Sequence, residues 1–219
     1  PWNDIRVRKA ANLSVDREGM KELLNGLMIP AQGFMPPGSA WFGHPTFKPT
    51  YDPEAAKKLL AEAGYPQGFG VTLDCPNDRY VNDEAICQAV TAMWTRIGVQ
   101  TELKTESRAT YFPRIDKGEV DAFMLGWLGN VDPFDFYHAQ HITGGSSNYQ
   151  KYSNPQVDDL LTRASTETEQ EARKGLYDEA TRLIVDDVSY LYLYNPDVVQ
   201  AWAPGLTGYE IRADKAINF

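Results

Sequence analysis

Helical and extended segments alternate along this chain, and no other feature of its 219 residues limits the fold so strongly. Short strand-like segments bounded by turn residues are expected at residues 71–73, 99–104, 121–127 and 190–194. Apolar residues recur at helical spacing in the segments between them. This order of helices and strands predicts an α/β domain, with a mixed or mostly parallel sheet flanked by helices.

Two helix starts are clearly marked. Asp52 can accept hydrogen bonds from free backbone N–H groups, and Pro53 suits the first turn of the helix that follows. Asn154 and Pro155 repeat this arrangement later in the chain. Residues 27–51, by contrast, are interrupted by prolines throughout, so we expect a loop without regular structure there.

The composition is that of a folded domain, with 42% hydrophobic and 23% charged residues. The longest apolar stretches, such as residues 122–128, are far shorter than the roughly 18 to 20 residues that span a bilayer. There are 21 basic and 30 acidic residues, which give a net charge of −9, and the basic residues are scattered. Such a charge repels a phosphate backbone, so we expect no nucleic-acid partner.

Cys75 and Cys87 are the two cysteines of the sequence. They form no CxxC pair and lie near no histidine cluster, so they indicate no metal or redox motif. Cys75 ends a predicted strand, and Cys87 lies in the first turns of the helix expected after it. An oxidising compartment would permit a disulfide between them, and two separate buried thiols fit the sequence equally well.

Several motifs resemble those of one known family. They are Asn-Asp-Ile-Arg-Val-Arg-Lys-Ala at residues 3–10, Tyr-Asp-Pro-Glu-Ala-Ala-Lys-Lys-Leu-Leu at 51–60, Ala-Gly-Tyr-Pro at 63–66 and Gly-Trp-Leu-Gly-Asn-Val-Asp-Pro at 126–133. Tyr149, Tyr152 and the segment 190–195 continue the match. In content and order these motifs resemble family 5 of the bacterial extracellular solute-binding proteins, the dipeptide- and oligopeptide-binding type.

The resemblance implies one lobe of a type II periplasmic binding protein fold. Residues 1–219 would form a single ligand-binding lobe, the C-terminal one. The first lobe is absent from this chain, so we expect a fragment. It implies the solute-binding component of an ABC importer, located in the periplasm or otherwise outside the cytoplasm, with neither enzymatic activity nor a cofactor. The expected partners are a peptide or similar small polar solute, captured noncovalently in the interlobe cleft, and the permease subunits in the membrane. We expect a monomer.

Ligands of open α/β sheets bind outside the carboxyl ends of the strands. Two loops have this position, residues 75–82 and residues 126–136. Arg79 and Tyr80 lie in the first of them, where a place in the ligand cleft and a solvated charge beside a half-buried ring fit equally well.

Three further residues are candidates for ligand contact. Trp127 resembles the cleft tryptophan of the family, and we interpret it as such in preference to a core aromatic. Asn148 and Tyr149 follow the glycine- and serine-rich residues 144–147, a segment that could adapt to a ligand or could equally be a surface loop.

Asn130 marks a departure from the family. Peptide binders of this type commonly carry an acidic residue directly after Gly-Trp-x-Gly, and it pairs with the α-ammonium group of the ligand. The resemblance therefore implies weaker selection for a free N-terminus here, because a neutral hydrogen bond is roughly half as strong as a charged one. Asp132 could replace the missing carboxylate, or could serve only as a turn residue before Pro133.

The alternative class is a hydrolase with Asp132 and Asp135 as its catalytic pair. Such a pair needs two carboxylates of divergent pKa facing one cleft. His138 and His141 lie near Asp135, but no clear third and fourth ligand accompanies them, so we expect no metal. The sequence has no GxSxG, Walker or HExxH pattern.

Overall fold

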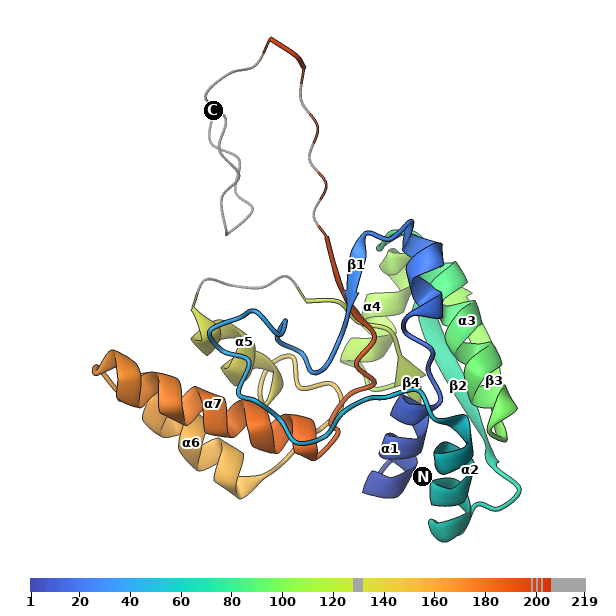
Figure 1. The fold of residues 1–219 in the computed structure, drawn as a ribbon, viewed down its shortest axis with the longest axis horizontal. Coiled ribbons are helices and arrows are strands. Elements are labelled where there is room, and N and C mark those ends of the chain that lie inside the picture. The colour runs from blue at the N-terminus through green and yellow to red at the C-terminus, as the bar shows by residue number, and fades with distance from the viewer. Residues whose placement is uncertain (128–131, 198, 200, 202, 206–219) are drawn as a thin grey trace.

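The computed structural model describes residues 1–127, 132–197, 199, 201 and 203–205. Its helices are α1 (Ile5–Leu13), the 3-10 helix η1 (Gly19–Leu24), α2 (Pro53–Glu62), α3 (Asp83–Arg96), α4 (Arg108–Asp116), α5 (Pro133–Gln140), α6 (Pro155–Thr166) and α7 (Gln170–Asp186). Its strands are β1 (Met28–Pro30), β2 (Phe69–Pro76), β3 (Val99–Glu106), β4 (Ala122–Phe123) and β5 (Tyr194–Pro196). Figure 1 shows β2, β3 and β4 with α1 to α4 on one side of the molecule and α5, α6 and α7 on the other.

A parallel three-stranded sheet organises the first group of elements. Its order is β3-β2-β4, with Phe69 opposite Val99 and Leu73 opposite Ala122. Parallel neighbours need a crossover connection, and α3 supplies it between β2 and β3. A separate antiparallel pair, β1 with β5, places Ile29 opposite Asn195. The predicted α/β architecture is therefore confirmed, with parallel and antiparallel strand pairs in two separate sheets.

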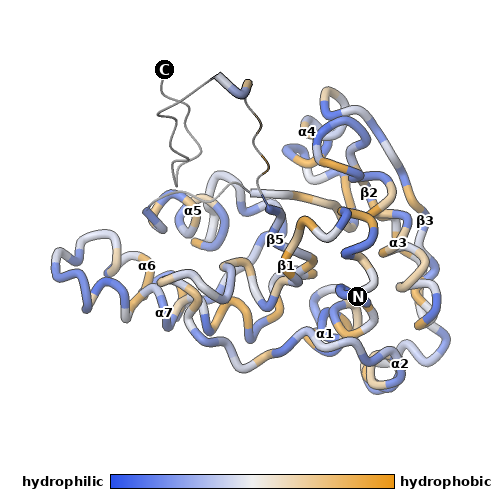
Figure 2. Tube along the Cα trace, turned by 45° about the horizontal axis from the view of Figure 1, so that its top comes forward, coloured by the Kyte–Doolittle hydropathy of each residue, from blue (hydrophilic) through white to orange (hydrophobic). Residues whose placement is uncertain are grey.

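Two main hydrophobic cores lie on either side of the molecule. The first joins α1, α2, α3 and the sheet, and its fully covered side chains include Val7, Leu60, Ile86, Val90 and Trp94. The second joins α5, α6 and α7 through residues that include Tyr137, Val157, Leu161, Tyr177 and Ile184. Figure 2 shows hydrophobic residues along β2 and hydrophilic ones at the far end of the α6–α7 pair. No helix among the described residues is long and apolar enough to cross a membrane.

Both predicted helix starts are confirmed. The Asp52 carboxylate accepts a hydrogen bond from the Ala55 N–H at 2.9 Å, and α2 begins at Pro53. The side-chain oxygen of Asn154 accepts one from the Gln156 N–H at 3.0 Å, and α6 begins at the proline after it. Each cap satisfies a backbone N–H that has no partner within its helix.

The strand expected at residues 121–127 is much shorter than predicted, because β4 ends at Phe123. Tyrosine hydroxyls bind the backbone beyond that point. Tyr111 donates to the carbonyl of Met124, and the Tyr80 hydroxyl accepts from the Gly126 N–H at 2.9 Å. Side chains here provide hydrogen bonds that a neighbouring strand would otherwise provide.

The strand expected at residues 190–194 is also shifted, because β5 begins only at Tyr194. Asn12 and Arg17 bind the backbone before it. The Asn12 amide donates to the Tyr190 carbonyl at 2.9 Å, and Arg17 donates to the Tyr192 carbonyl at 2.5 Å. The loop prediction for residues 27–51 needs one correction as well, since β1 forms there by pairing with β5.

Candidate functional site

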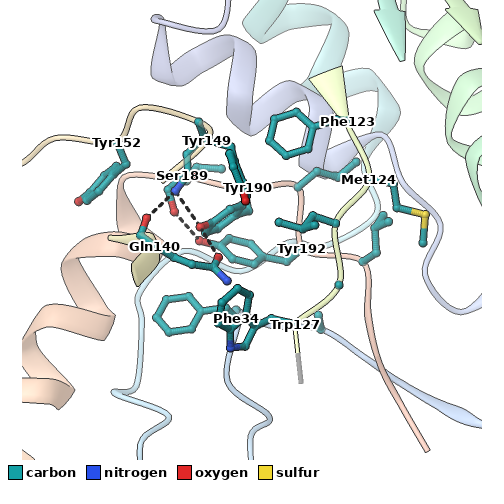
Figure 3. A pocket seen from close by; sticks show the side chains of 18 of the residues that line it. Phe34, Phe123, Met124, Trp127, Gln140, Tyr149, Tyr152, Ser189, Tyr190 and Tyr192 are labelled. Atoms are coloured by element: carbon teal, nitrogen blue, oxygen red, sulfur yellow. Dashed lines mark hydrogen bonds between the residues drawn. The ribbon is translucent and has the colours of Figure 1, made fainter. Parts of the chain in front are cut away.

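A cavity of about 1420 Å³ opens between the two groups of elements, and we call it the central cavity. It lies at the carboxyl edge of the parallel sheet, beside the end of β4 and the loop that joins β2 to α3. Its lining includes Arg79, Tyr80, Trp127, Asp132, Tyr149 and Tyr190. Figure 3 shows aromatic side chains converging on it from segments far apart in the sequence. Five of the six predicted site residues that the structure describes therefore border one space.

Arg79 and Tyr80 are held in place by the start of α3. The Asp83 carboxylate accepts hydrogen bonds from both backbone N–H groups, each at 3.0 Å. The Arg79 guanidinium lies over the Tyr80 ring, 4.9 Å from its centre. This arrangement places a cation and an aromatic ring at the rim of the central cavity.

Trp127 follows β4 and is 42% exposed, so it is not a core aromatic. Its ring lies 5.9 Å from that of Phe136 in a T-shaped contact. Figure 3 places it beside Phe34 at the cavity wall. An exposed indole in a cavity wall presents apolar surface to an incoming molecule.

The Asp132 carboxylate is already engaged. Its two oxygens accept hydrogen bonds from the Arg173 guanidinium, both at 2.8 Å, and one also accepts from the Phe134 N–H to cap α5. The hydrogen bonds from Arg173 lower the pKa of Asp132. A ligand ammonium group would have to share this carboxylate with Arg173. Asn130 lies outside the described residues.

Asn148 and Tyr149 are neighbours in sequence but differ in their relation to the central cavity. The Asn148 amide donates to the carbonyls of Ile142 and Tyr152 and accepts from the Tyr152 N–H, so it organises its own loop. Asn148 does not line the central cavity, whereas Tyr149 does. The Tyr149 ring faces Phe123 at 6.4 Å, and burial raises the pKa of its hydroxyl.

Sequence reasoning missed a chain of polar groups on the cavity wall. Gln150 donates to the Tyr190 hydroxyl at 2.7 Å, and Tyr190 donates to the side-chain oxygen of Gln140 at 3.0 Å. All three residues line the central cavity. No local pattern in the sequence connects these three residues, and only the tertiary fold brings them together.

Cys75 and Cys87 form a disulfide, which decides between the two alternatives left open by the sequence. The bond joins the end of β2 to the first turns of α3. Met124 packs on it, with its sulfur 3.5 Å from that of Cys87. Both Cys87 and Met124 border the central cavity, so the disulfide fixes part of its wall.

His138 and His141, the two histidines considered for metal binding, pack in different surroundings. His141 is fully buried among aromatic rings, whereas the His138 ring stacks on Phe134 at 4.1 Å. Within the described part of the chain, no group of three or more histidine, cysteine, aspartate or glutamate side chains could hold a metal ion.

Comparison with known proteins identifies the class. Residues 1–149 match the family model described as bacterial extracellular solute-binding proteins, family 5 Middle. The match covers more than half of the chain, so the chain belongs to this family.

Comparison with individual proteins agrees with the family match. The dipeptide-binding protein of Escherichia coli (strain K12) is 30% identical over 96% of this chain and 41% of its own length. Heme-binding protein A of Haemophilus influenzae is 31% identical over 95% of this chain and 40% of its own length. The chain therefore spans about two fifths of the length of these relatives.

Two solved structures have the same fold. One is the ABC transporter-associated periplasmic binding protein DppA from Helicobacter pylori in complex with the peptide STSA, with a TM-score of 0.80 and 25% identity over 89% of this chain and 39% of that chain. The other is the dipeptide binding protein from Pseudoalteromonas sp. SM9913 in complex with Met-Leu, with a TM-score of 0.81 and 27% identity over 90% of this chain and 40% of that chain.

Proposed function

We propose that this chain is the ligand-capturing C-terminal lobe of the solute-binding component of an ABC importer. The observation that carries the proposal is the central cavity, an aromatic-lined space of about 1420 Å³ at the carboxyl edge of a parallel sheet. Ligand sites of open α/β sheets occupy this position, and ligand pockets are commonly lined by aromatic side chains. Membership of family 5 supports the same conclusion.

The proposed ligand is a peptide or a similar small polar solute. Two relatives are named for dipeptide or heme binding, and two similar structures hold peptides. The cavity offers a guanidinium at Arg79 and aromatic surfaces at Tyr80, Trp127 and Tyr149. These groups suit a solute that combines a negatively charged end with apolar parts.

The proposed mechanism is noncovalent capture by closure of two lobes. Residues 1–219 would supply one wall of the cleft, and a first lobe the other. The ligand favours the closed state because only that state contacts it on both sides. The protein would work as a monomer outside the cytoplasm and deliver its solute to permease subunits in the membrane.

The hydrolase alternative loses its chemical basis at Asp132. Both oxygens of its carboxylate accept hydrogen bonds from Arg173, so neither is free to act on a substrate while this ion pair is intact. Asp132 is also fixed as the cap of α5. We therefore propose binding without turnover.

Calorimetry on the full-length protein tests the proposal. A panel of dipeptides should bind weakly, with measurable heat, and mass spectrometry should find the peptides uncleaved. Because residue 130 is neutral here, Asn130→Asp should strengthen the binding of peptides with a free N-terminus, and N-acetylated peptides should show no such gain. Cleaved peptides, or no binding of any peptide, would refute the proposed function.

The role of Asp132 needs its own pair of variants. Asp132→Asn removes the carboxylate, whereas Arg173→Met breaks the same ion pair but keeps the carboxylate at the cavity. Loss of peptide binding in Asp132→Asn alone would make Asp132 the ammonium anchor. Equal effects in both variants would show that the ion pair matters only for structure.

A further inference from the structure

The direction of every hydrogen bond in the polar chain Gln150–Tyr190–Gln140 can be fixed. The Gln150 side-chain nitrogen lies 2.9 Å from the backbone carbonyl oxygen of Gln140 and 2.7 Å from the Tyr190 hydroxyl. A carbonyl oxygen only accepts, so the atom facing it must be the amide nitrogen of Gln150. That nitrogen therefore donates to Tyr190 as well.

The next link follows from this one. The Tyr190 hydroxyl has a single hydrogen, and it donates that hydrogen to Oε1 of Gln140, 3.0 Å away. The reverse orientation of the Gln140 amide would leave this hydrogen without an acceptor among the described residues. The remaining polar atom of the Gln140 side chain is consequently the nitrogen Nε2, with two hydrogens to donate. The chain thus ends in a donor whose orientation is set by its neighbours.

Nε2 of Gln140 is buried and has no hydrogen-bond partner among the described residues. Gln140 is only 4% exposed and lines the central cavity. Figure 3 shows the amide on the side of Phe34 and Trp127, away from the Tyr190 hydroxyl. A buried donor without a partner is costly, so folded proteins seldom keep one without a reason.

The Gln140 amide faces aromatic rings, among them Phe34 and Trp127 (Figure 3). Phe34 and Phe136 lie 5.2 Å apart, and Trp127 lies 5.9 Å from Phe136. The neighbouring His141 ring packs 4.9 Å from Phe34, and its burial lowers its pKa to about 3, so it is neutral at ordinary pH. An ionised carboxylate would pay a large desolvation penalty among these rings, whereas a neutral oxygen would not.

We infer that Gln140 forms a ligand subsite that binds a neutral acceptor oxygen, of the amide, ester or hydroxyl type, carried on a flat or apolar part of the solute. The inference rests on the proposed function and adds the chemistry of one end of the ligand. Access requires an aromatic ring to turn aside. Trp127 suits this role because it is 42% exposed, whereas Phe34 packs on three other rings.

Calorimetry with paired dipeptides tests the subsite in the full-length protein. Ala-Gln and Ala-Tyr carry a neutral side-chain acceptor, and Ala-Met and Ala-Phe are their counterparts without it. The wild type should prefer the acceptor-bearing member of at least one pair by about tenfold, as expected for one neutral hydrogen bond. Gln140→Met should abolish this preference. Gln88→Met, which replaces an exposed glutamine on α3, should keep it.

Benzamide, an aromatic ring with a neutral carbonyl, provides a readout that does not depend on peptide binding. In soaked crystals of the full-length protein, its oxygen should lie within hydrogen-bonding distance of Nε2 of Gln140. No peptide binding with benzamide in this position would refute the proposed function and support the subsite. Peptides that bind without preference, or a protein oxygen or an undisplaced water on Nε2 after soaking, would overturn the inference.

Discussion

The Tyr80 hydroxyl accepts a hydrogen bond from the Gly126 N–H at 2.9 Å, across 46 residues of sequence. The two residues are also in close steric contact, because a Cβ atom on Gly126 would lie only 2.9 Å from the Tyr80 ring. The loop that carries Arg79 and the segment that carries Trp127 are therefore locked together. Two separate loops at the carboxyl edge of the sheet act as one wall of the central cavity.

Tyr80→Phe should loosen this wall. The change removes two hydrogen bonds, the one that the Tyr80 hydroxyl accepts from the Gly126 N–H and the one that it donates to the Gly126 carbonyl at 3.3 Å. We therefore expect a loss of about 1–2 kcal/mol in the free energy of unfolding. Solute affinity should fall as well, because Trp127 is no longer held. Urea unfolding and calorimetry measure both effects. Tyr51→Phe, at a ring that is 49% exposed, is the control, and an equal effect there would contradict the prediction.

Arg114→Met should destabilise the domain far more. Arg114 donates to Asp74 at 2.6 Å and to Glu106 at 2.9 Å, and Asp74 is only 1% exposed. Without Arg114 the buried Asp74 carboxylate loses its cation, and an uncompensated buried charge is strongly destabilising. Denaturant unfolding should show this loss.

Two variants control that measurement. Arg163→Met breaks an exposed ion pair with Asp159 and should change stability by less than about 1 kcal/mol. Asp74→Leu combined with Arg114→Met removes the buried charge together with its partner and should recover part of the stability. A double variant as unstable as Arg114→Met alone would show that the packing of these side chains, and not the ion pair, matters.

Features set by neighbouring residues could be predicted from the sequence, whereas features set by distant tertiary contacts could not. Asp52 and Asn154 cap helices that start one residue later, so these starts were readable from neighbouring residues. The strand expected at residues 190–194 failed because Asn12 and Arg17 bind its backbone from 175 to 178 residues away. A sequence pattern carries no trace of such a partner.

The same distinction applies to the central cavity. Arg79, Tyr80 and Trp127 could be placed at its rim because they follow predicted strands, and strand ends share one edge of a parallel sheet. The contact between Gln140 and Tyr190 could not be predicted, since it joins residues 50 apart in the sequence. Their proximity depends on how α5 packs against the chain that follows α7.

The Cys75–Cys87 disulfide should contribute about 3 kcal/mol to stability, as the chain-entropy relation gives for residues 12 apart in sequence. Replacing both cysteines by serine should lower the free energy of unfolding by about this amount. Reductant should destabilise the wild type similarly and leave the double variant unaffected. Two reactive thiols in the unfolded, unreduced protein would disprove the bond.

His141 should make the domain sensitive to mild acid. Its ring is fully buried among Phe34, Tyr137, Tyr190 and other aromatic side chains, and neither ring nitrogen has a hydrogen-bond partner among the described residues. Burial lowers its pKa from 6.5 to about 3. The unfolded chain therefore binds a proton in the window between these two values that the native state does not bind. Stability must then fall as the pH falls from 6.5 toward 3.

The size of the effect can be stated for a convenient interval. Between pH 7 and pH 5 the unfolded state gains on the order of 2 kcal/mol from protonating this one imidazole, because the native ring stays neutral throughout. His141→Phe keeps an aromatic ring in the aromatic cluster and removes the titrating group, so its stability should depend less on pH by that amount. Urea unfolding of both proteins at pH 7 and pH 5 measures the difference. If the variant loses as much stability as the wild type between the two pH values, other groups cause the acid sensitivity and His141 does not.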